Sequence, residues 1–366
     1  MVIRAKTEGL RQTQPLTKKR ADNTALNINE MREGKVLLQS KPQRLVFELT
    51  NMCNLNCVMC GRNATNFTST FFKVEWFYRF QDVFCSIEEI TLMGWGEPTI
   101  HPHFSEMLKI MHHAGLRKYF CTNGMRLKEL EDDIFNYEVD IIAISMDGAD
   151  NETNAKIRRG ADFNKIITAL RSIAARKKME NLMWPHMNFV FTAMKSNIAQ
   201  LPVVVDLAAD IGLDEVKVVF LTVFSPSLLG ESLYNESESV KKYFSEANEI
   251  AEKNNILLKL PHVKGTDPAG EKLHKDCFTA YRDFFLGSDG YIRACMSSPE
   301  KLFHIDKYAN FNNMWNSLEH QSWRCTVNDS KNMPDACKRC YQSSYANWNK
   351  EHAFMQIVET FAPEWS

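Results

Sequence analysis

Long hydrophobic runs are missing from this sequence of 366 residues, which contains no stretch of 18 consecutive apolar residues. Its first residues, MVIRAKTEGLRQ, also lack the apolar core of a signal peptide. We therefore expect neither a membrane-spanning segment nor export, and we predict a cytoplasmic protein. Internal repeats and low-complexity tracts are absent too, which favours an ordinary globular chain of one or two domains.

An excess of charge of one sign is also missing. The chain has 44 Lys and Arg residues against 45 Asp and Glu residues, so its formal net charge is -1. Because no overall basic field would attract phosphates, we do not expect nucleic acid as a partner.

Cysteine, in contrast, is plentiful. Ten cysteines occur in a chain without an export signal, and in a reducing compartment clustered thiols hold metal more often than they form disulfides. Three fall within the eight residues CNLNCVMC, and four more lie toward the end of the chain. The candidate metal ligands are Cys53, Cys57, Cys60, Cys277, Cys295, Cys337 and Cys340.

The middle of the chain alternates between β-branched apolar runs and helical patterns, which is typical of a parallel α/β sheet. An open doubly wound sheet and a barrel both fit this rhythm. The count of runs favours a partial (β/α)6 TIM-like barrel, whose chemistry lies at the carboxyl ends of its strands. The six predicted strands are Leu45–Leu49, Ile90–Met93, Lys118–Cys121, Ile141–Met146, Met187–Met194 and Val216–Leu221.

Local signals place several element ends. Gly115 and Gly212 are expected to stop helices, and Asn164 is expected to cap one. The pair Asp289-Gly290 predicts a β-hairpin. We expect a loose or partly helical arm over residues 1–43, the barrel over 44–255, and a small cysteine-rich domain with a terminal helix over 256–366.

The first cysteine group follows the first predicted strand, so it should lie at the reactive face. Structural zinc sites and ordinary iron–sulfur clusters use four protein ligands. Three cysteines in one loop can bind three irons of a 4Fe–4S cube and leave the fourth iron open for a small molecule. A zinc loop remains the alternative on these eight residues alone.

The spacing C-x3-C-x2-C after the first strand resembles the signature of the radical S-adenosylmethionine (SAM) enzymes. MGWGEP (Met93 to Pro98), CTNG (Cys121 to Gly124), SMDG (Ser145 to Gly148) and KIRRG follow in the order of that family's motifs. Trp95 departs from the family, which commonly has a small residue there. The resemblance implies SAM contacts by Met59, Gly96, Glu97, Asn123, Ser145 and Arg158.

Two of these roles are specific. The resemblance assigns Glu97 to the SAM ammonium and Arg158 to the SAM carboxylate, because a guanidinium binds a carboxylate bidentately. Arg159 remains the alternative to Arg158.

The second cysteine group resembles the SPASM/twitch extensions of radical SAM enzymes. Cys277 and Cys295 flank the predicted hairpin, with Gly290 five residues before Cys295, and Cys337 and Cys340 form a C-x2-C pair. Four cysteines are fewer than a full SPASM domain has, so the resemblance implies the shorter twitch type with one auxiliary 4Fe–4S cluster. A zinc ribbon is the alternative.

The resemblance implies an enzyme that cleaves SAM to a 5′-deoxyadenosyl radical and abstracts a hydrogen atom from its substrate, with a flavodoxin- or ferredoxin-type electron donor. A second cluster could accept an electron, so we expect a radical SAM oxidoreductase that dehydrogenates a small molecule such as a sugar or cyclitol. The alternatives are a maturase of ribosomal peptides and a non-catalytic zinc module. No residue of the sequence is identified as a proton or hydrogen donor.

Overall fold

The computed structural model describes residues 16–64, 68–261, 277–295, 300–329, 331–335 and 337. Within these ranges, no helix is both long enough and apolar enough to cross a membrane.

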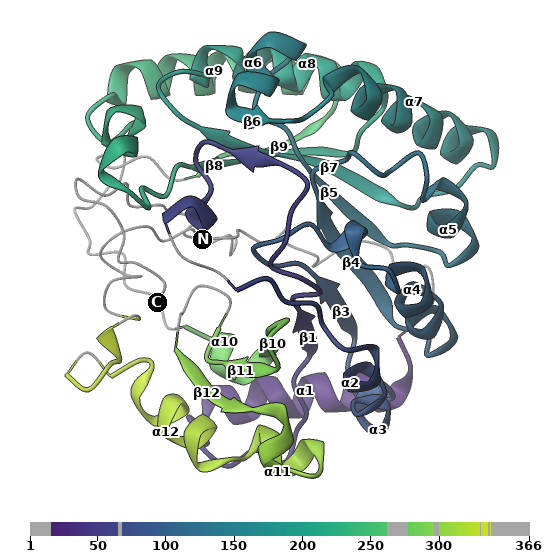
Figure 1. The fold of residues 1–366 in the computed structure, drawn as a ribbon, viewed down its shortest axis with the longest axis vertical. Helices are drawn as coiled ribbons and strands as arrows, with labels where there is room; N and C mark the ends of the chain where they lie inside the picture. The colour runs from purple at the N-terminus through teal and green to yellow at the C-terminus, as the bar shows by residue number, and fades with distance from the viewer. Residues whose placement is uncertain are drawn as a thin grey trace.

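A curved, ten-stranded sheet runs through the described chain (Figure 1). Its strand order is β12-β11-β10-β1-β3-β4-β5-β7-β8-β9, and all pairings from β10 to β9 are parallel. The six strands expected for a partial barrel are all present, each within two residues of its predicted ends, and this confirms the predicted fold class. They are β1 (Arg44–Phe47), β3 (Glu89–Leu92), β4 (Arg117–Thr122), β5 (Ile141–Ser145), β7 (His186–Ala193) and β8 (Glu215–Phe220).

Helices cover the outer side of this sheet (Figure 1). Gly212 ends α8 in the left-handed conformation at φ 90°, as its sequence position predicted. The predicted cap Asn164 is wrong: Asp162 caps α7, because its carboxylate accepts the Lys165 N–H at 3.0 Å. The helices are α2 (Val74–Tyr78), α3 (Gln81–Phe84), α4 (Phe104–His113), α5 (Glu131–Asn136), α6 (Asn151–Ile157), α7 (Phe163–Met179), α8 (Leu201–Ile211) and α9 (Ser237–Asn254).

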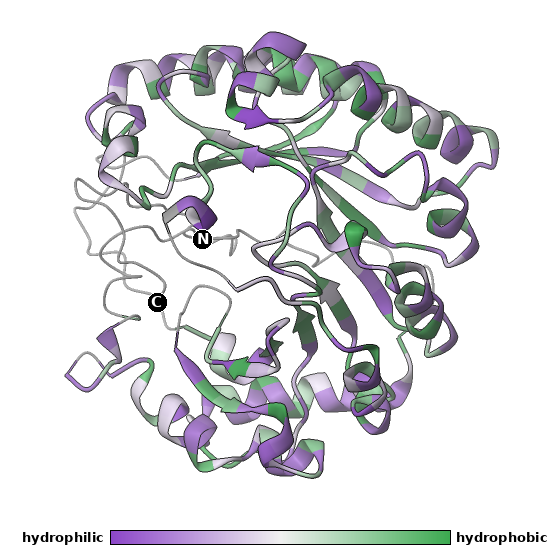
Figure 2. Ribbon diagram, viewed as in Figure 1, coloured by the Kyte–Doolittle hydropathy of each residue, from purple (hydrophilic) through white to green (hydrophobic). Residues whose placement is uncertain are grey.

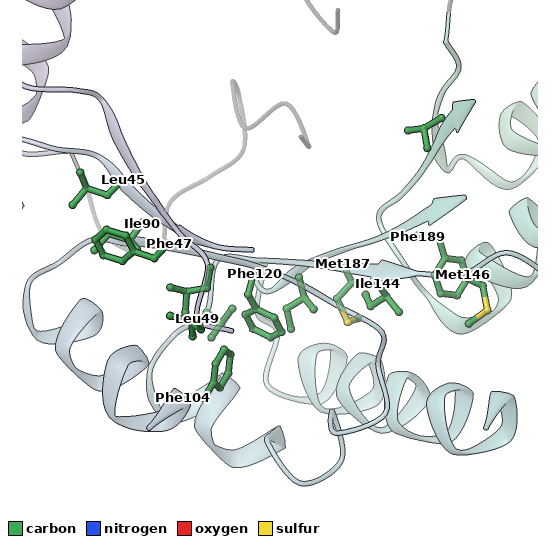
Figure 3. Packing of buried hydrophobic residues seen from close by; sticks show 14 of the residues in the cluster. Leu45, Phe47, Leu49, Ile90, Phe104, Phe120, Ile144, Met146, Met187 and Phe189 are labelled. Carbon is green, nitrogen blue, oxygen red and sulfur yellow. The ribbon is translucent and has the colours of Figure 1, made fainter. Parts of the chain in front are cut away.

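The main core lies between the sheet and these helices. Alternate strand residues such as Phe47, Phe120 and Phe189 are fully buried on this side, and Phe104 of α4 meets Phe120 edge-on at 5.2 Å (Figure 3). Hydrophobic residues accordingly line the inner sides of the helices, and hydrophilic residues lie on their outer sides (Figure 2).

The other face of the sheet carries buried charges near the amino ends of its strands. Arg44 forms an ion pair with Asp283 at 2.5 Å and lies 3.8 Å from Glu89, while Arg117 donates to Glu89 at 2.9 Å. These four residues are neighbours in register on β10, β1, β3 and β4. The pairing of opposite charges offsets the cost of burying them.

The C-terminal region extends the same sheet. Strand β10 (Asp283–Leu286) pairs with β1, and the Asp289-Gly290 turn leads back into β11 (Tyr291–Arg293), with Gly290 at φ 79°. The predicted hairpin is therefore confirmed. Strand β9 (Leu257–Lys259) completes the opposite edge. The remaining elements here are α10 (Thr279–Arg282), β12 (Lys301–His304), α11 (Phe311–Trp315) and α12 (Leu318–Thr326).

Helix α1 (Lys18–Arg32) comes from the predicted N-terminal arm and packs against this region. Its Asn27 side chain donates to the Tyr281 carbonyl at 2.9 Å, and the buried Glu30 carboxylate accepts the Gln39 and Ser40 N–H groups. The expected terminal helix of the C-terminal domain lies outside the described residues.

His320 is a buried base in the C-terminal core. Its Nδ1 lies 2.9 Å from the Met314 carbonyl, and its ring stacks on Phe284 at 5.5 Å. Burial, with the nearby Arg324 charge, lowers the pKa of His320 from 6.5 to about 3. The folded protein therefore holds this imidazole neutral, whereas the unfolded chain binds a proton below about pH 6.5.

We predict that His320 makes the protein less stable as the pH falls from 6.5 toward 3. The unfolded state gains one proton over that window, which amounts to roughly 1.4 kcal/mol of unfolding free energy per pH unit. His320→Phe should flatten the pH dependence by that slope in urea unfolding. The exposed His113→Gln serves as the control, and an unchanged slope in His320→Phe would contradict the assignment.

Candidate functional site

The three cysteines of CNLNCVMC lie on one loop after β1, at the carboxyl edge of the sheet. All three are partly buried. Within the loop, the two-residue strand β2 (Asn56–Cys57) pairs with β6 (Arg158–Arg159), with Cys57 opposite Arg158. This pairing joins the cysteine loop to the segment that follows α6.

Two thiols of the loop, Cys53 and Cys57, are partly buried and each receives a hydrogen bond from a nearby N–H group. Burial raises the pKa of Cys53, and it raises the pKa of Cys57 to about 11, so a bound metal would have to displace their protons. The Leu55 N–H donates to Cys53 Sγ at 3.4 Å, and Arg158 Nη1 donates to Cys57 Sγ at 3.9 Å. Such donors stabilise thiolate sulfur.

In the described part of the chain, no three His, Cys, Asp or Glu side chains meet as the ligands of a single metal ion do. A cubic cluster has a different requirement, since each cysteine binds its own iron. Three thiols on one loop, two of them with N–H donors, therefore fit a 4Fe–4S cluster with one iron left without a protein ligand.

Glu97 lies at the start of a short turn after β3 and is buried. Its Oε1 accepts from Thr122 Oγ1 at 2.7 Å and Thr99 Oγ1 at 2.6 Å, and its Oε2 accepts the Asn123 N–H at 2.7 Å. Burial raises the pKa of Glu97, and these donors oppose the shift. The carboxylate thus joins the turns that follow β3 and β4.

Gly96 packs directly on the start of the cysteine loop. A Cβ atom there would come within 3.0 Å of the carbonyl oxygens of Thr50 and Met52, and the Glu97 N–H donates to Met52 at 2.8 Å. Only glycine permits this approach of two backbones. The predicted cofactor loop and the cysteine loop are therefore in contact.

Asn123 lies beside the first cysteine. Its Nδ2 is 3.7 Å from Cys53 Sγ and donates to Asn54 Oδ1 at 2.7 Å. Ser145 ends β5, and Met59 is buried with Ile157, Met194 and Leu221 beside the cysteine loop. All the predicted cofactor residues thus lie on loops or strand ends at one edge of the sheet.

The structure distinguishes the two arginines of KIRRG. Arg158 is buried, Arg159 is exposed, and the Arg158 guanidinium pairs with Asp147 at 2.7 Å. Burial lowers the pKa of Arg158, but the charges of Asp147 and Cys57 outweigh that effect and raise it. Arg158, and not Arg159, is therefore the fixed cation beside the cysteine loop.

The second cysteine group is described in part. Cys277, Cys295 and Cys337 are partly exposed, and Cys340 lies outside the described residues. Burial raises the pKa of Cys337 to about 11, with a contribution from the nearby Cys277. Asn328 Oδ1 accepts the Cys277 N–H at 2.7 Å, which holds Cys277 against the turn that follows α12.

Sequence reasoning missed two buried carboxylates at this edge, Glu48 and Asp147. Glu48 accepts the Trp95 N–H at 2.8 Å, and Asp147 Oδ1 accepts the Thr192 N–H at 2.7 Å. For Glu48 a signal was present, because LVFEL places one carboxylate among apolar residues of the first predicted strand.

A buried polar cluster on β7, β8 and β9 was missed as well. Glu215 Oε2 lies 3.2 Å from His186 and 3.1 Å from Lys259, while Oε1 lies 3.6 Å from Lys217. Burial lowers the pKa of Lys217 to about 7, although the negative charge of Glu215 acts to raise it. Burial raises the pKa of Glu215, but His186 and the two lysines outweigh it and bring it to about 2. Lys217 of β8 lies opposite Lys259 of β9. In the same register, Lys217 lies opposite Val190 of β7, and Val190 lies opposite Ser145 of β5.

Comparison with solved structures supports the fold. The chain resembles Streptococcus suis SuiB bound to S-adenosylmethionine with a TM-score of 0.66 and 14% identity, over 92% of this chain and 81% of SuiB. SuiB has also been solved with the precursor peptide SuiA. At this identity the likeness concerns the fold.

Among curated proteins, the chain is 26% identical to a tungsten-containing aldehyde ferredoxin oxidoreductase cofactor-modifying protein of Pyrococcus furiosus. That match covers 60% of this chain and 63% of the relative. This chain is also 32% identical to the mycofactocin maturase MftC of Mycobacterium ulcerans, in a match that covers 37% of each chain. The matches therefore span less than two thirds of these relatives.

Two family matches coincide with the two cysteine groups. Residues 47–186 match the radical SAM superfamily, and residues 277–341 match the SPASM iron–sulfur cluster-binding domain. The first range includes the cysteine loop, Glu97 and Arg158, and its cofactors are SAM and a 4Fe–4S cluster. The chain is therefore a member of the radical SAM superfamily with a SPASM-type domain after its core.

Proposed function

We propose that this protein is a radical SAM maturase that modifies a peptide. The observation that carries the proposal is the combination of a radical SAM core with a SPASM domain in a chain related to a mycofactocin maturase. The shared fold with SuiB, which binds a precursor peptide, adds support.

Each group of residues has a task in this proposal. Cys53, Cys57 and Cys60 hold the SAM-binding cluster. Arg158, fixed by Asp147, receives the SAM carboxylate, and Glu97, held in place by Asn123 and Thr122, receives the SAM ammonium. When bound, SAM and its cluster supply a radical that removes a hydrogen atom from the substrate. The chain's own part is to orient these groups and to keep water away.

The SPASM region has the second task. Cys277, Cys295, Cys337 and Cys340 would hold an auxiliary cluster, which would supply an electron acceptor for a net oxidation. Oxidation of a small molecule, which we expected from the sequence, would use the same arrangement. The maturase function ranks ahead of it because the relatives reported above are maturases or modifying proteins.

The proposal can be tested with the reconstituted protein under anaerobic conditions. Incubation with SAM, dithionite and peptides encoded by neighbouring genes should yield 5′-deoxyadenosine and a peptide of altered mass. Deuterium from a labelled peptide should appear in 5′-deoxyadenosine. If a sugar or cyclitol is oxidised while no peptide changes mass, the maturase assignment is wrong and the dehydrogenase takes its place.

We predict that the reconstituted protein holds two 4Fe–4S clusters, or roughly eight irons per chain. Replacing Cys53, Cys57 and Cys60 together by alanine should leave about half of that iron, because the second cysteine group is untouched. Iron and sulfide analysis measures this. Cys85→Ala, which removes an exposed thiol outside both groups, should retain all the iron. A triple variant with full iron content would contradict the first site.

We also predict that Glu97→Ala weakens SAM binding by about 1.5–3 kcal/mol, the usual effect of losing a charged hydrogen-bond partner. The carboxylate supports the loop through Thr122 and Asn123, so its loss should disorder that loop. Equilibrium binding of SAM to the cluster-loaded protein measures the change. Glu106→Ala, which removes an exposed carboxylate on α4, is the control. Unchanged affinity in Glu97→Ala would remove Glu97 from the site.

A further inference from the structure

Glu48 lies where three parts of the molecule meet. It directly follows β1, and only 5% of it is exposed. Its backbone N–H donates to the Leu286 carbonyl of β10 at 3.0 Å. Its side chain is therefore placed between the core and the C-terminal region.

The Glu48 carboxylate accepts hydrogen bonds from both sides. Oε1 accepts the Trp95 N–H at 2.8 Å, in the loop that leads to Glu97. Oε2 accepts the Ser288 Oγ–H at 3.0 Å and the Ser288 N–H at 3.3 Å, in the turn between β10 and β11. One side chain thus holds the cofactor loop and the hairpin turn.

Close packing leaves this connection little freedom. A Cβ atom on Gly94 would come within 3.0 Å of the Glu48 side chain, so the loop backbone lies directly against it. Trp95 is fixed at its other end, because its ring lies against Gly61 and meets Phe224 edge-on at 5.5 Å. Gly61 directly follows Cys60.

The hairpin turn is held in the same way. Ser288 Oγ also lies 2.8 Å from Thr70 Oγ1, and Thr70 belongs to the segment that follows the cysteine loop. After the turn, β11 leads to Cys295, a proposed ligand of the auxiliary cluster. The loop at 94–97 is therefore linked to Cys295 through buried contacts: Glu48 bonds to Ser288, and the turn that contains Ser288 leads through β11 to Cys295.

Burial of a carboxylate is costly without several donors. Burial raises the pKa of Glu48, while the Trp95 N–H, the Arg293 charge and the Ser288 donors oppose that shift. A core required only to pack would be served better by an apolar residue here. The three donors come from two segments far apart in the sequence, which indicates a positioning task.

We propose that Glu48 is a positioning residue that couples the SAM-binding loop at 94–97 to the hairpin turn at 287–290, so that SAM binding orders the approach to Cys295. The inference rests on the proposed function, since it needs SAM to contact that loop. It adds a defined contact between the SAM site and the SPASM region.

Hydrogen–deuterium exchange with the anaerobic, cluster-loaded protein tests this coupling with SAM as the probe. In the wild type, SAM should slow amide exchange in residues 91–98 and in residues 286–294. Glu48→Gln keeps the side-chain volume but replaces one carboxylate oxygen by an NH2 group. That group cannot accept a hydrogen bond from Trp95 or Ser288. The variant should bind SAM about three- to tenfold more weakly and lose the SAM-dependent slowing in 286–294.

A second variant guards against misfolding. Ser288→Ala keeps the contact between Glu48 and Trp95 and removes only the hydroxyl donor. It should bind SAM as the wild type does, with a smaller response in 286–294. Glu30→Gln is the matched control, because Glu30 is also buried and accepts the Gln39 and Ser40 N–H groups at 2.9 and 3.0 Å. It should keep both responses.

Two results would overturn the coupling. One is a response of 286–294 to SAM in Glu48→Gln that equals that of the wild type. The other is a wild type in which SAM slows 91–98 and leaves 286–294 unchanged. A wild type that shows no response in 91–98 would instead refute the SAM contact in the proposed function, and the coupling with it.

Discussion

The site depends on the position of β1 in the middle of a parallel sheet. This strand is hydrogen-bonded to β3 on one side and to β10 on the other. Parallel neighbours end at the same edge, so the segments that follow β1, β3 and β10 must meet there. These segments are the cysteine loop, the loop that contains Glu97, and the hairpin turn before Cys295. The pairing of β10 with β1 therefore brings a distant part of the sequence to the same edge.

Buried carboxylates then fix these segments against one another. Glu48 joins the turns after β3 and β10, Glu97 joins the turns after β3 and β4, and Asp147 holds Arg158 beside the cysteine loop. Each accepts donors from a segment other than its own. A buried carboxylate is stable only with such donors, so these loops are ordered by the same contacts that satisfy the charges.

Glycine makes this arrangement possible at two positions. Gly94 lets the loop backbone reach Glu48, and Gly96 lets it reach the carbonyls of Thr50 and Met52. Any side chain would separate the cofactor loop from the cysteine loop. The large Trp95 between them is accommodated because its ring lies over a third glycine, Gly61. This explains how the chain carries tryptophan where the family commonly has a small residue.

The sequence by itself determined the strands, the barrel class and the two cysteine groups, because period, spacing and motif order are local properties. It also identified Glu97 and Arg158 as candidates, but it could not separate Arg158 from Arg159. Tertiary structure distinguishes the surroundings of the two, since the pairing of β2 with β6 places Arg158 beside Cys57 and Asp147 and leaves Arg159 exposed. For Glu48, the sequence showed a carboxylate among apolar residues but not which groups it contacts. Its partners Trp95 and Ser288 are 47 and 240 residues away along the chain, and only the pairing of β1 with β3 and β10 brings them together.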